Sequence, residues 1–234
     1  MRLVWVLLIA VLLSSPGWGA AISVSPVRIR LLQEQPVASV RVRNDGDSAV
    51  LLQAETFRWR IEEGRDVLAP TRALIAVPPL FRLEPGASQL VRIGLRVPFP
   101  EQREESYRLF LTEVAEADER PAQGVRFALR LSLPVFAVPE GARPDVRWRL
   151  LRVGGRWLLE ADNRGRAHLR VEELTLVHPG GGTWRVPDAA AYVLAESRMR
   201  WRVPNLPLRP GERIALRLRT QQDTIRVELR LEEG

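Results

Sequence analysis

The chain of 234 residues contains no cysteine and no lysine, and it has only two histidines, His168 and His178. Without cysteine there is no disulfide bond to support folding in an oxidising compartment, no cysteine nucleophile and no thiolate ligand for a metal. The two histidines fall in different expected elements and no ligand spacing links them, so the sequence indicates no metal site. All basic residues are arginines, which we interpret as a compositional bias.

The arginines are not clustered, although the formal net charge at pH 7 is +7. Many alternate with apolar residues, as in RFALRL (126–131) and IALRLR (214–219). This pattern is typical of solvated sheet faces, whereas a nucleic-acid surface needs clustered cations interleaved with stacking aromatic rings. We therefore expect no nucleic acid as a partner, while attraction to acidic partners stays open.

Long apolar runs are absent after the first residues of the chain. The run LVWVLLIAVLL (3–13) follows Arg2 and precedes the small-residue segment SSPGWGAA (14–21). It is shorter than the ~20 residues of a membrane-spanning helix, and its flanks predict a secretory signal peptide over residues 1–21. We expect cleavage after Ala21; cleavage after Gly19 and an uncleaved membrane anchor are the alternatives. The mature chain is then exported and is not embedded in the membrane.

Motifs that mark enzyme active sites are also missing. There is no Gly-x-Ser-x-Gly elbow and no phosphate-binding loop. The glycine run after His178 predicts a tight hairpin loop. Glu104 and Glu105 are adjacent carboxylates, but adjacent residues on a strand point to opposite faces and cannot flank one substrate. We expect no catalytic residue, no cofactor and no enzymatic activity.

The sequence does contain many short runs in which apolar and polar residues alternate. They recur at intervals of about 8–12 residues and are separated by Gly, Pro, Asn and Asp, which predicts β-sandwiches. The segment VPEGARP (138–144) divides them into two series. We expect an all-β chain with domains at 22–138 and 145–234 and a linker at 139–144. AAAYVLAESRMR (189–200) is the one patch that is ambiguous between strand and helix.

The run GVRFALRLSLPVF (124–136) shows the alternation most clearly. Its odd-numbered residues include Val125, Phe127, Leu129 and Leu131, and all of them are apolar. One face of this strand is therefore apolar. Such a face normally covers the protein's own core, but it can also be offered to a partner, and the pattern alone leaves both readings open.

Three segments carry a family resemblance: PPLFRLEPGASQLVRIGLRV (78–97), REESYRLFLTEV (103–114) and RFALRLSLPVFAVP (126–139). In this order they resemble the first domain of periplasmic pilus chaperones of the chaperone–usher pathway. SPVRI (25–29) looks like the family's N-terminal strand, and EADNRGRAHLRV (160–171) gives a weaker similarity in the second domain. The cysteine-free chain and its Leu-Pro-Val-Phe look most like the archaic, spore-coat-U-type branch.

The resemblance implies two immunoglobulin-like β-sandwich domains set at an angle, with a cleft between them. It implies an ATP-independent periplasmic chaperone that binds pilus, fimbrial or spore-coat-U-like subunits and delivers them to an outer-membrane usher. Such subunits lack a strand, and an extended segment can fill the gap through main-chain hydrogen bonds, with alternate side chains in pockets. The residues on the family's donor positions are Val125, Phe127, Leu129 and Leu131.

The resemblance also assigns residues to the cleft. Arg28 falls on the family's arginine that anchors the subunit's terminal carboxylate, which a guanidinium can hold through two parallel hydrogen bonds. The family's lysine position is occupied by Pro134, which cannot bind an anion. Either Arg28 acts alone, or another arginine such as Arg130 substitutes, or anchoring is weaker. Glu104 falls on an acid that bridges the two domains, with Asp223 as its proposed counterpart in an interdomain salt bridge.

Two other classes of protein compete with this interpretation. A secreted structural or adhesive subunit would be a single domain with an N-terminal donor extension, whereas here Ile22 begins an expected strand almost at once. A carbohydrate-binding module would need an exposed aromatic platform, whereas the seven tryptophans are scattered along the sequence.

Overall fold

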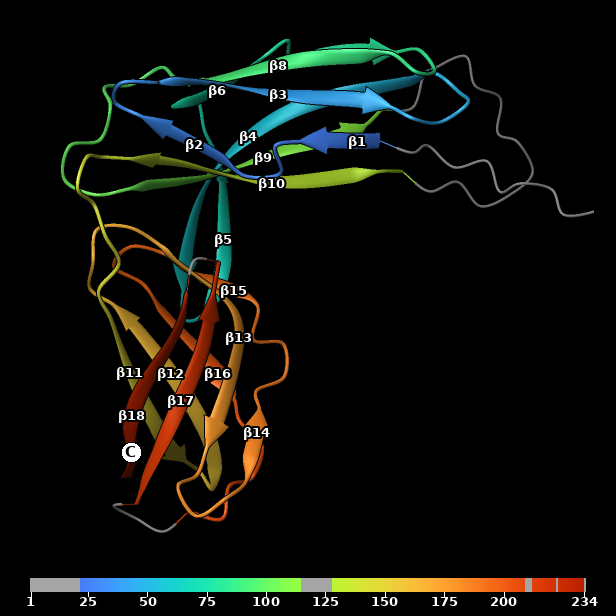
Figure 1. The fold of residues 1–234 in the computed structure, drawn as a ribbon. Helices are drawn as coiled ribbons and strands as arrows, with labels where there is room; N and C mark the ends of the chain where they lie inside the picture. The colour runs from blue at the N-terminus through green and yellow to red at the C-terminus, as the bar shows by residue number, and fades with distance from the viewer. Residues whose placement is uncertain (1–21, 115–127, 209–211, 222, 234) are drawn as a thin grey trace, which may run out of the picture.

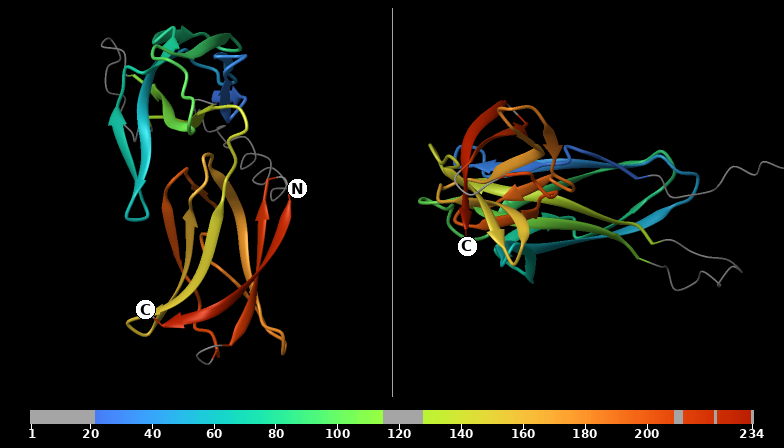
Figure 2. Two further views of the ribbon diagram at one scale, coloured as in Figure 1. Left: turned by 90° about the vertical axis from the view of Figure 1, so that its left-hand side faces the viewer. Right: turned by 90° about the horizontal axis from the view of Figure 1, so that it is seen from below.

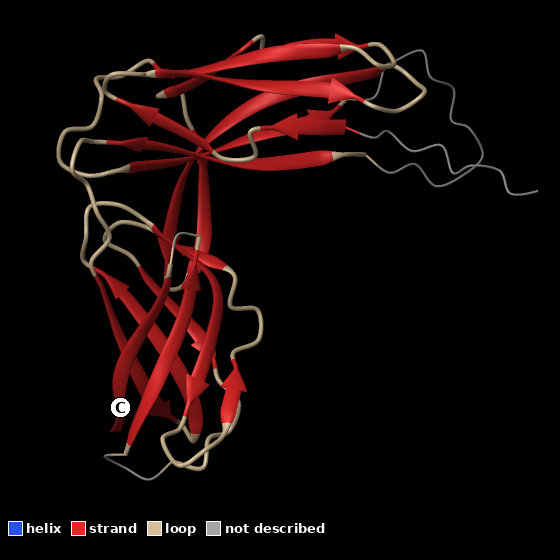
Figure 3. Cartoon of the chain, in the orientation of Figure 1, coloured by secondary structure: helices blue, strands red, loops and turns tan. Residues whose placement is uncertain are grey.

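The computed structural model describes residues 22–114, 128–208, 212–221 and 223–233. These residues form strands joined by turns and loops, and they contain no helix (Figure 3). No helix in the described part of the chain is therefore long and apolar enough to cross a bilayer. The strands form two β-units that meet at an angle and give the molecule the shape of an L (Figure 1).

The first unit is a sandwich of two sheets. One sheet has the strand order β1 (Ile22–Ser25), β3 (Val37–Asn44), β8 (Ser88–Leu95) and β6 (Leu74–Val77). The other has the order β2 (Ile29–Leu32), β10 (Arg130–Val138), β9 (Glu105–Glu113), β4 (Val50–Glu62) and β5 (Arg65–Pro70), and β7 (Leu80–Leu83) pairs with β4.

The alternation seen in the sequence builds the core of this sandwich. Val40 and Val42 of β3 point into it from one sheet, and Leu109 and Leu111 of β9 from the other, and all four are fully buried. The residues between them point to the opposite face of each sheet, as the period of two requires.

The alternating segment 22–32 is divided between the two sheets. Pro26 has no N–H to donate to a sheet ladder, and here the chain leaves β1 in one sheet and enters β2 in the other. The ambiguous patch 189–200 is also divided, because a turn at 194–197 separates β15 (Ala191–Val193) from β16 (Arg198–Arg202).

The second unit is one continuous sheet wrapped around its own core. Its order is β14 (Thr183–Arg185), β13 (Leu169–Val177), β17 (Arg213–Thr220), β18 (Thr224–Glu233), β11 (Val146–Val153), β12 (Arg156–Asn163) and β16, and β15 pairs with β13. Its buried cluster includes Trp157, Leu174 and Leu216 from three of these strands. Two of the five tryptophans in the described residues, Trp148 and Trp184, are half-buried, and the other three are buried, so none of these five forms an exposed aromatic platform.

A small apolar cluster joins the two units. Phe136 and Val138 at the end of β10 pack with Trp59 of β4 and Leu194 of the second unit. The long β4–β5 hairpin extends from the first unit alongside the second (Figure 2). At its tip Gly64 lies next to the backbone of Arg200 in β16.

Candidate functional site at the strand edge and the cleft

Strand β10 has an open edge. It pairs with β9 along its full length, Arg130 to Ala137, but with β2 only from Val135 to Val138. Within the described residues, positions 130–134 therefore have a strand neighbour on one side only. An edge of this kind presents unpaired N–H and C=O groups that another strand can bind.

The hydrogen bonds show which groups face outward. The N–H of Glu113 donates to the carbonyl of Leu129 (2.8 Å), and the N–H of Leu129 donates to Glu113 Oε2 (3.2 Å). Because bonding alternates along an antiparallel pair, Leu131 and Leu133 also direct their backbone groups toward β9. The backbone groups of Arg130 and Ser132 then point to the open edge, and Pro134 lacks the N–H that would point there.

The apolar side chains of β10 become less buried toward the open end. Leu133 is only 5% exposed and belongs to the core, whereas Leu131 is half-buried and packs at the edge of that core. Leu129 is also half-buried. The other two donor positions, Val125 and Phe127, lie outside the described residues.

The predicted anchor Arg28 lies at the cleft end of this edge. Continuing the β2–β10 register by one residue places Arg28 beside Pro134, and Pro134 is paired with Arg108 of β9. The three residues thus form one row across neighbouring strands, on the face opposite the core. All three line a cavity of about 400 Å³ between the two units.

Arg108 is the basic side chain that the sequence analysis did not single out. Its guanidinium carbon lies 3.7 Å from the centre of the Trp59 ring, and its side chain is 17% exposed. Burial lowers the pKa of Arg108 from its ordinary value, while Asp66, 3.7 Å away, opposes this shift. Arginine remains charged at neutral pH in spite of such a shift, so the cleft holds a partly dry cation already positioned by an aromatic ring. A one-dimensional pattern could not reveal this residue, because its role depends on the pairing of β9 with β10.

Arg130 lies away from Pro134. It is four residues from Pro134, or about 13 Å along the strand. Its guanidinium lies 4.2 Å from the centre of the Phe110 ring, away from the cleft.

The cleft contains further cations and a contact between the units. Arg28 donates a hydrogen bond to Gln221 Oε1 of the second unit. Arg170 of β13 lines the same cavity, and among its described lining residues Asp66 is the only acid. The arrangement therefore favours an anionic ligand.

The proposed bridge between Glu104 and Asp223 is corrected by the structure. Both carboxylate oxygens of Glu104 lie at 2.8 and 2.9 Å from His168 Nδ1, and the Glu104 side chain is 1% exposed. The His168 ring stacks on Phe136 with 3.8 Å between ring centres. Asp223 instead lies in the turn between β17 and β18, where its N–H donates to Thr220 Oγ1. The second unit does supply a partner for Glu104, but it is a histidine whose proximity the sequence spacing did not reveal.

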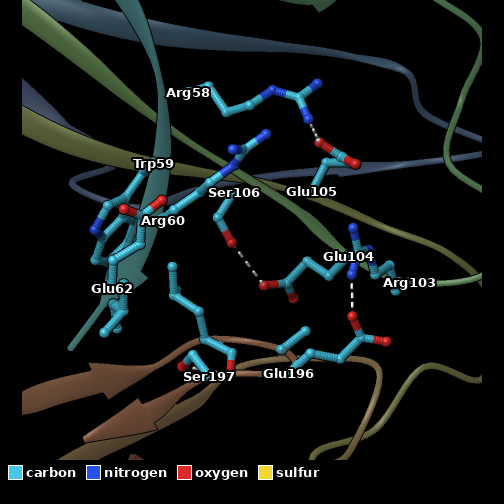
Figure 4. A pocket seen from close by; sticks show the side chains of 13 residues that line it. Arg58, Trp59, Arg60, Glu62, Arg103, Glu104, Glu105, Ser106, Glu196 and Ser197 are labelled. Atoms are coloured by element: carbon cyan, nitrogen blue, oxygen red, sulfur yellow. Dashed lines mark hydrogen bonds and ion pairs between the residues drawn. The ribbon is translucent and has the colours of Figure 1, made fainter. Parts of the chain in front are cut away.

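A second hollow, of about 200 Å³, shares Trp59 with the cleft (Figure 4). Two ion pairs within the protein lie in its lining: Arg58 with Glu105 at 2.7 Å, and Arg103 of the first unit with Glu196 of the second. We interpret it as part of the junction between the units. In the described part of the chain no group of three or more acidic or histidine side chains is arranged to hold a metal.

The chain is similar to known proteins in sequence and in fold. The model of pili and flagellar-assembly chaperones, PapD N-terminal domain, matches residues 21–143. The chaperone protein PapD of Escherichia coli is 27% identical over 153 residues, which cover 62% of each chain, so the match spans less than two thirds of that relative.

Solved structures show the same fold. A chain in the CsuC–CsuE chaperone–tip adhesion subunit pre-assembly complex of Acinetobacter baumannii has a TM-score of 0.69 at 21% identity, covering 92% of this chain and 100% of that one. A chain in the complex of Salmonella enterica SafA pilin with the SafB chaperone has a TM-score of 0.66 at 17% identity, covering 89% and 96%.

Proposed function

The chain belongs to the family of pili and flagellar-assembly chaperones defined by the PapD N-terminal domain, and we propose that it binds incomplete pilus subunits in the periplasm. The single observation that carries this proposal is the open edge of β10 at residues 130–134, which leads directly into a cationic cleft. This edge can supply main-chain hydrogen bonds to a subunit that lacks a strand. The chaperone then passes the subunit to an outer-membrane usher, without ATP and without catalysis.

Side chains on the donated edge provide the apolar part of the contact. Leu129 and Leu131 are half-buried in the free protein, so their exposed surface is available to fill pockets of the subunit. Val125 and Phe127 extend the same alternating pattern and are proposed to do the same. Burial of such side chains contributes about 25 cal/mol for each Å² of apolar surface removed from water.

The cleft provides the polar part of the contact. We assign the anchoring of the subunit's terminal carboxylate to Arg28 together with Arg108, which lie on either side of Pro134. Two guanidinium groups can hold one carboxylate through charge-assisted hydrogen bonds. Arg108 thereby fills the role that the family's lysine has at the position of Pro134.

The test is a comparison of two leucine variants on the same strand. Leu129→Asp should fold with near-normal thermal stability but fail to co-purify with a pilus subunit of the same genome co-expressed in the periplasm. A charge would otherwise enter an apolar pocket without a partner. Leu133→Asp, whose side chain lies in the core, should fail to fold. If Leu129→Asp also unfolds, the residue belongs to the core; if it folds and binds normally, this edge does not bind subunits.

Export to the periplasm is a separate part of the proposal. Residues 1–21 lie outside the described residues, and we infer their removal from the signal-peptide pattern. Intact mass of the protein recovered from the periplasm should give a chain that begins at Ile22. A mature chain that retains residues 1–21 contradicts this inference.

A further inference from the structure

Arg170, from the second unit, faces the same cavity as Arg28 and Arg108 of the first unit. Three guanidinium groups therefore surround a space in which Asp66, itself 53% exposed, is the only acid among the described lining residues. Like charges held close together in a partly dry cleft repel one another and attract an anion. Arg170 therefore adds a third positive charge to the cavity, beyond the charges of Arg28 and Arg108.

The intramolecular contacts of Arg170 are weak ones. Its Nε lies 4.0 Å from Glu172 Oε1, at the outer limit of an ion pair, and its side chain is 34% exposed. Glu172 is shared with Arg219, whose Nε lies 3.8 Å from its other carboxylate oxygen. A longer and shared ion pair of this kind contributes little to stability, so Arg170 can turn toward a ligand at small cost.

Tyr192 brings the cations of the two units together. It is paired with Arg170 in the β13–β15 ladder, and the guanidinium carbon of Arg170 lies 5.6 Å from the centre of its ring. The guanidinium carbon of Arg108 lies 6.0 Å from the same ring centre. Tyr192 is itself fixed by Trp59 and Phe136, with ring centres 5.4 Å away in each case. One fixed aromatic ring therefore positions a cation from each unit at the same cavity.

We propose that Arg170 is a third contact for the carboxylate of the bound subunit, so that the anchor spans both units. This proposal rests on the proposed function and adds the second unit to it. Because the carboxylate would touch both units, its binding would also hold them at a fixed angle. The Arg28–Gln221 hydrogen bond, which already joins the units at this place in the free protein, would be replaced by that ligand.

The test uses two synthetic peptides with the sequence of the last strand of a pilus subunit from the same genome. One has a free C-terminal carboxylate and the other an amide, and fluorescence anisotropy gives the Kd of each. Removal of one charge-assisted contact weakens binding about tenfold. Arg170→Gln should therefore weaken binding of the acid peptide about tenfold and leave the amide peptide nearly unchanged. Arg170→Lys, which keeps the charge but loses the planar fork, should retain part of the preference.

Arg219→Gln is the matched control, because it removes the same charge and also disturbs Glu172, but Arg219 is not among the residues that line the cavity. Its ratio of acid to amide affinity should equal that of the unmodified chaperone. If Arg170→Gln also leaves this ratio unchanged while Arg28→Gln lowers it, Arg170 is not part of the anchor and the proposed function stands. If the unmodified chaperone does not prefer the acid peptide, the proposed carboxylate anchor falls, and this inference falls with it.

Discussion

Arg108 lies directly across from Pro134 in the antiparallel pairing of β9 with β10, and its guanidinium rests on the ring of Trp59. The family's lysine position is thus occupied by Pro134, which carries no charge. The neighbouring strand β9 places the positive charge of Arg108 beside it. The structure therefore supplies a second cation next to Arg28 without a basic residue in β10 at the cleft.

The first prediction concerns this cation. Arg108→Ala should reduce affinity for a pilus subunit about ten- to a hundredfold, because a charge-assisted hydrogen bond contributes ~1.5–3 kcal/mol. Arg130→Ala is the matched control, since it also removes an arginine that stacks on an aromatic ring, but about 13 Å farther along the strand. Isothermal titration calorimetry measures both. Equal losses in the two variants would mean that Arg108 acts only through overall charge.

The second prediction concerns the open edge. Ser132→Pro removes an N–H that points away from β9, so the chaperone should remain folded. Affinity for the subunit should fall by about tenfold or more, because a hydrogen bond to the incoming strand is lost and the proline ring obstructs that strand. Leu131→Pro removes an N–H that points toward β9, and it should lower the Tm clearly. Thermal unfolding and subunit binding are measured for both variants. Undiminished binding by Ser132→Pro would exclude strand addition at this edge.

The third prediction concerns the junction of the two units. Glu104→Ala should loosen it, because the variant loses the contact with His168 and leaves that ring without its carboxylate partner. Amide hydrogen exchange in the segment 139–144 should then become faster and the Tm should fall. Asp223→Ala should change neither, because the structure shows Asp223 in a local turn with Thr220. An effect of Asp223→Ala on the junction would show that Asp223 also contributes to it.

The fourth prediction concerns stability at low pH. Glu160 is fully buried in the second unit between Arg149 and Arg200. Burial raises the pKa of Glu160, but hydrogen bonds and charge from the two arginines outweigh it and hold the pKa below its ordinary value of 4.5. The pKa is thus lower in the folded than in the unfolded chain. The resulting stability is present above pH 4.5 and is lost as the pH falls through the lower folded pKa.

Glu160→Gln should lower the free energy of unfolding at pH 7 by about 1–3 kcal/mol, because the side chain loses its charge and one of the two oxygens that accept hydrogen bonds from Arg149 and Arg200. The same variant should lose less stability than the unmodified protein between about pH 5 and pH 3, a window that begins just above the ordinary pKa of 4.5 and extends below it. Urea unfolding at several pH values measures both effects. A parallel decline of the two proteins with pH would show that Glu160 does not contribute to acid sensitivity.

The sequence alone determined the class of fold. Alternation with a period of two, interrupted by Gly, Pro, Asn and Asp, depends on neighbouring residues only, and for that reason it could be recognised in β3, β9 and β10 without a structure. It also showed that one face of the run 124–136 is apolar and that Pro134 cannot bind an anion.

The tertiary structure decided which side chains meet. The pairing of Arg108 with Pro134, the contact of Glu104 with His168 and the presence of Arg170 in the cleft each join segments that lie at least 26 residues apart in the chain. Such contacts depend on strand register and on the angle between the two units, and a local pattern carries neither. For the same reason the sequence left open how far the apolar face of β10 is buried. The structure shows that Leu133 is buried, whereas Leu131 and Leu129, which lie beyond the part of the chain that pairs with β2, are half-buried.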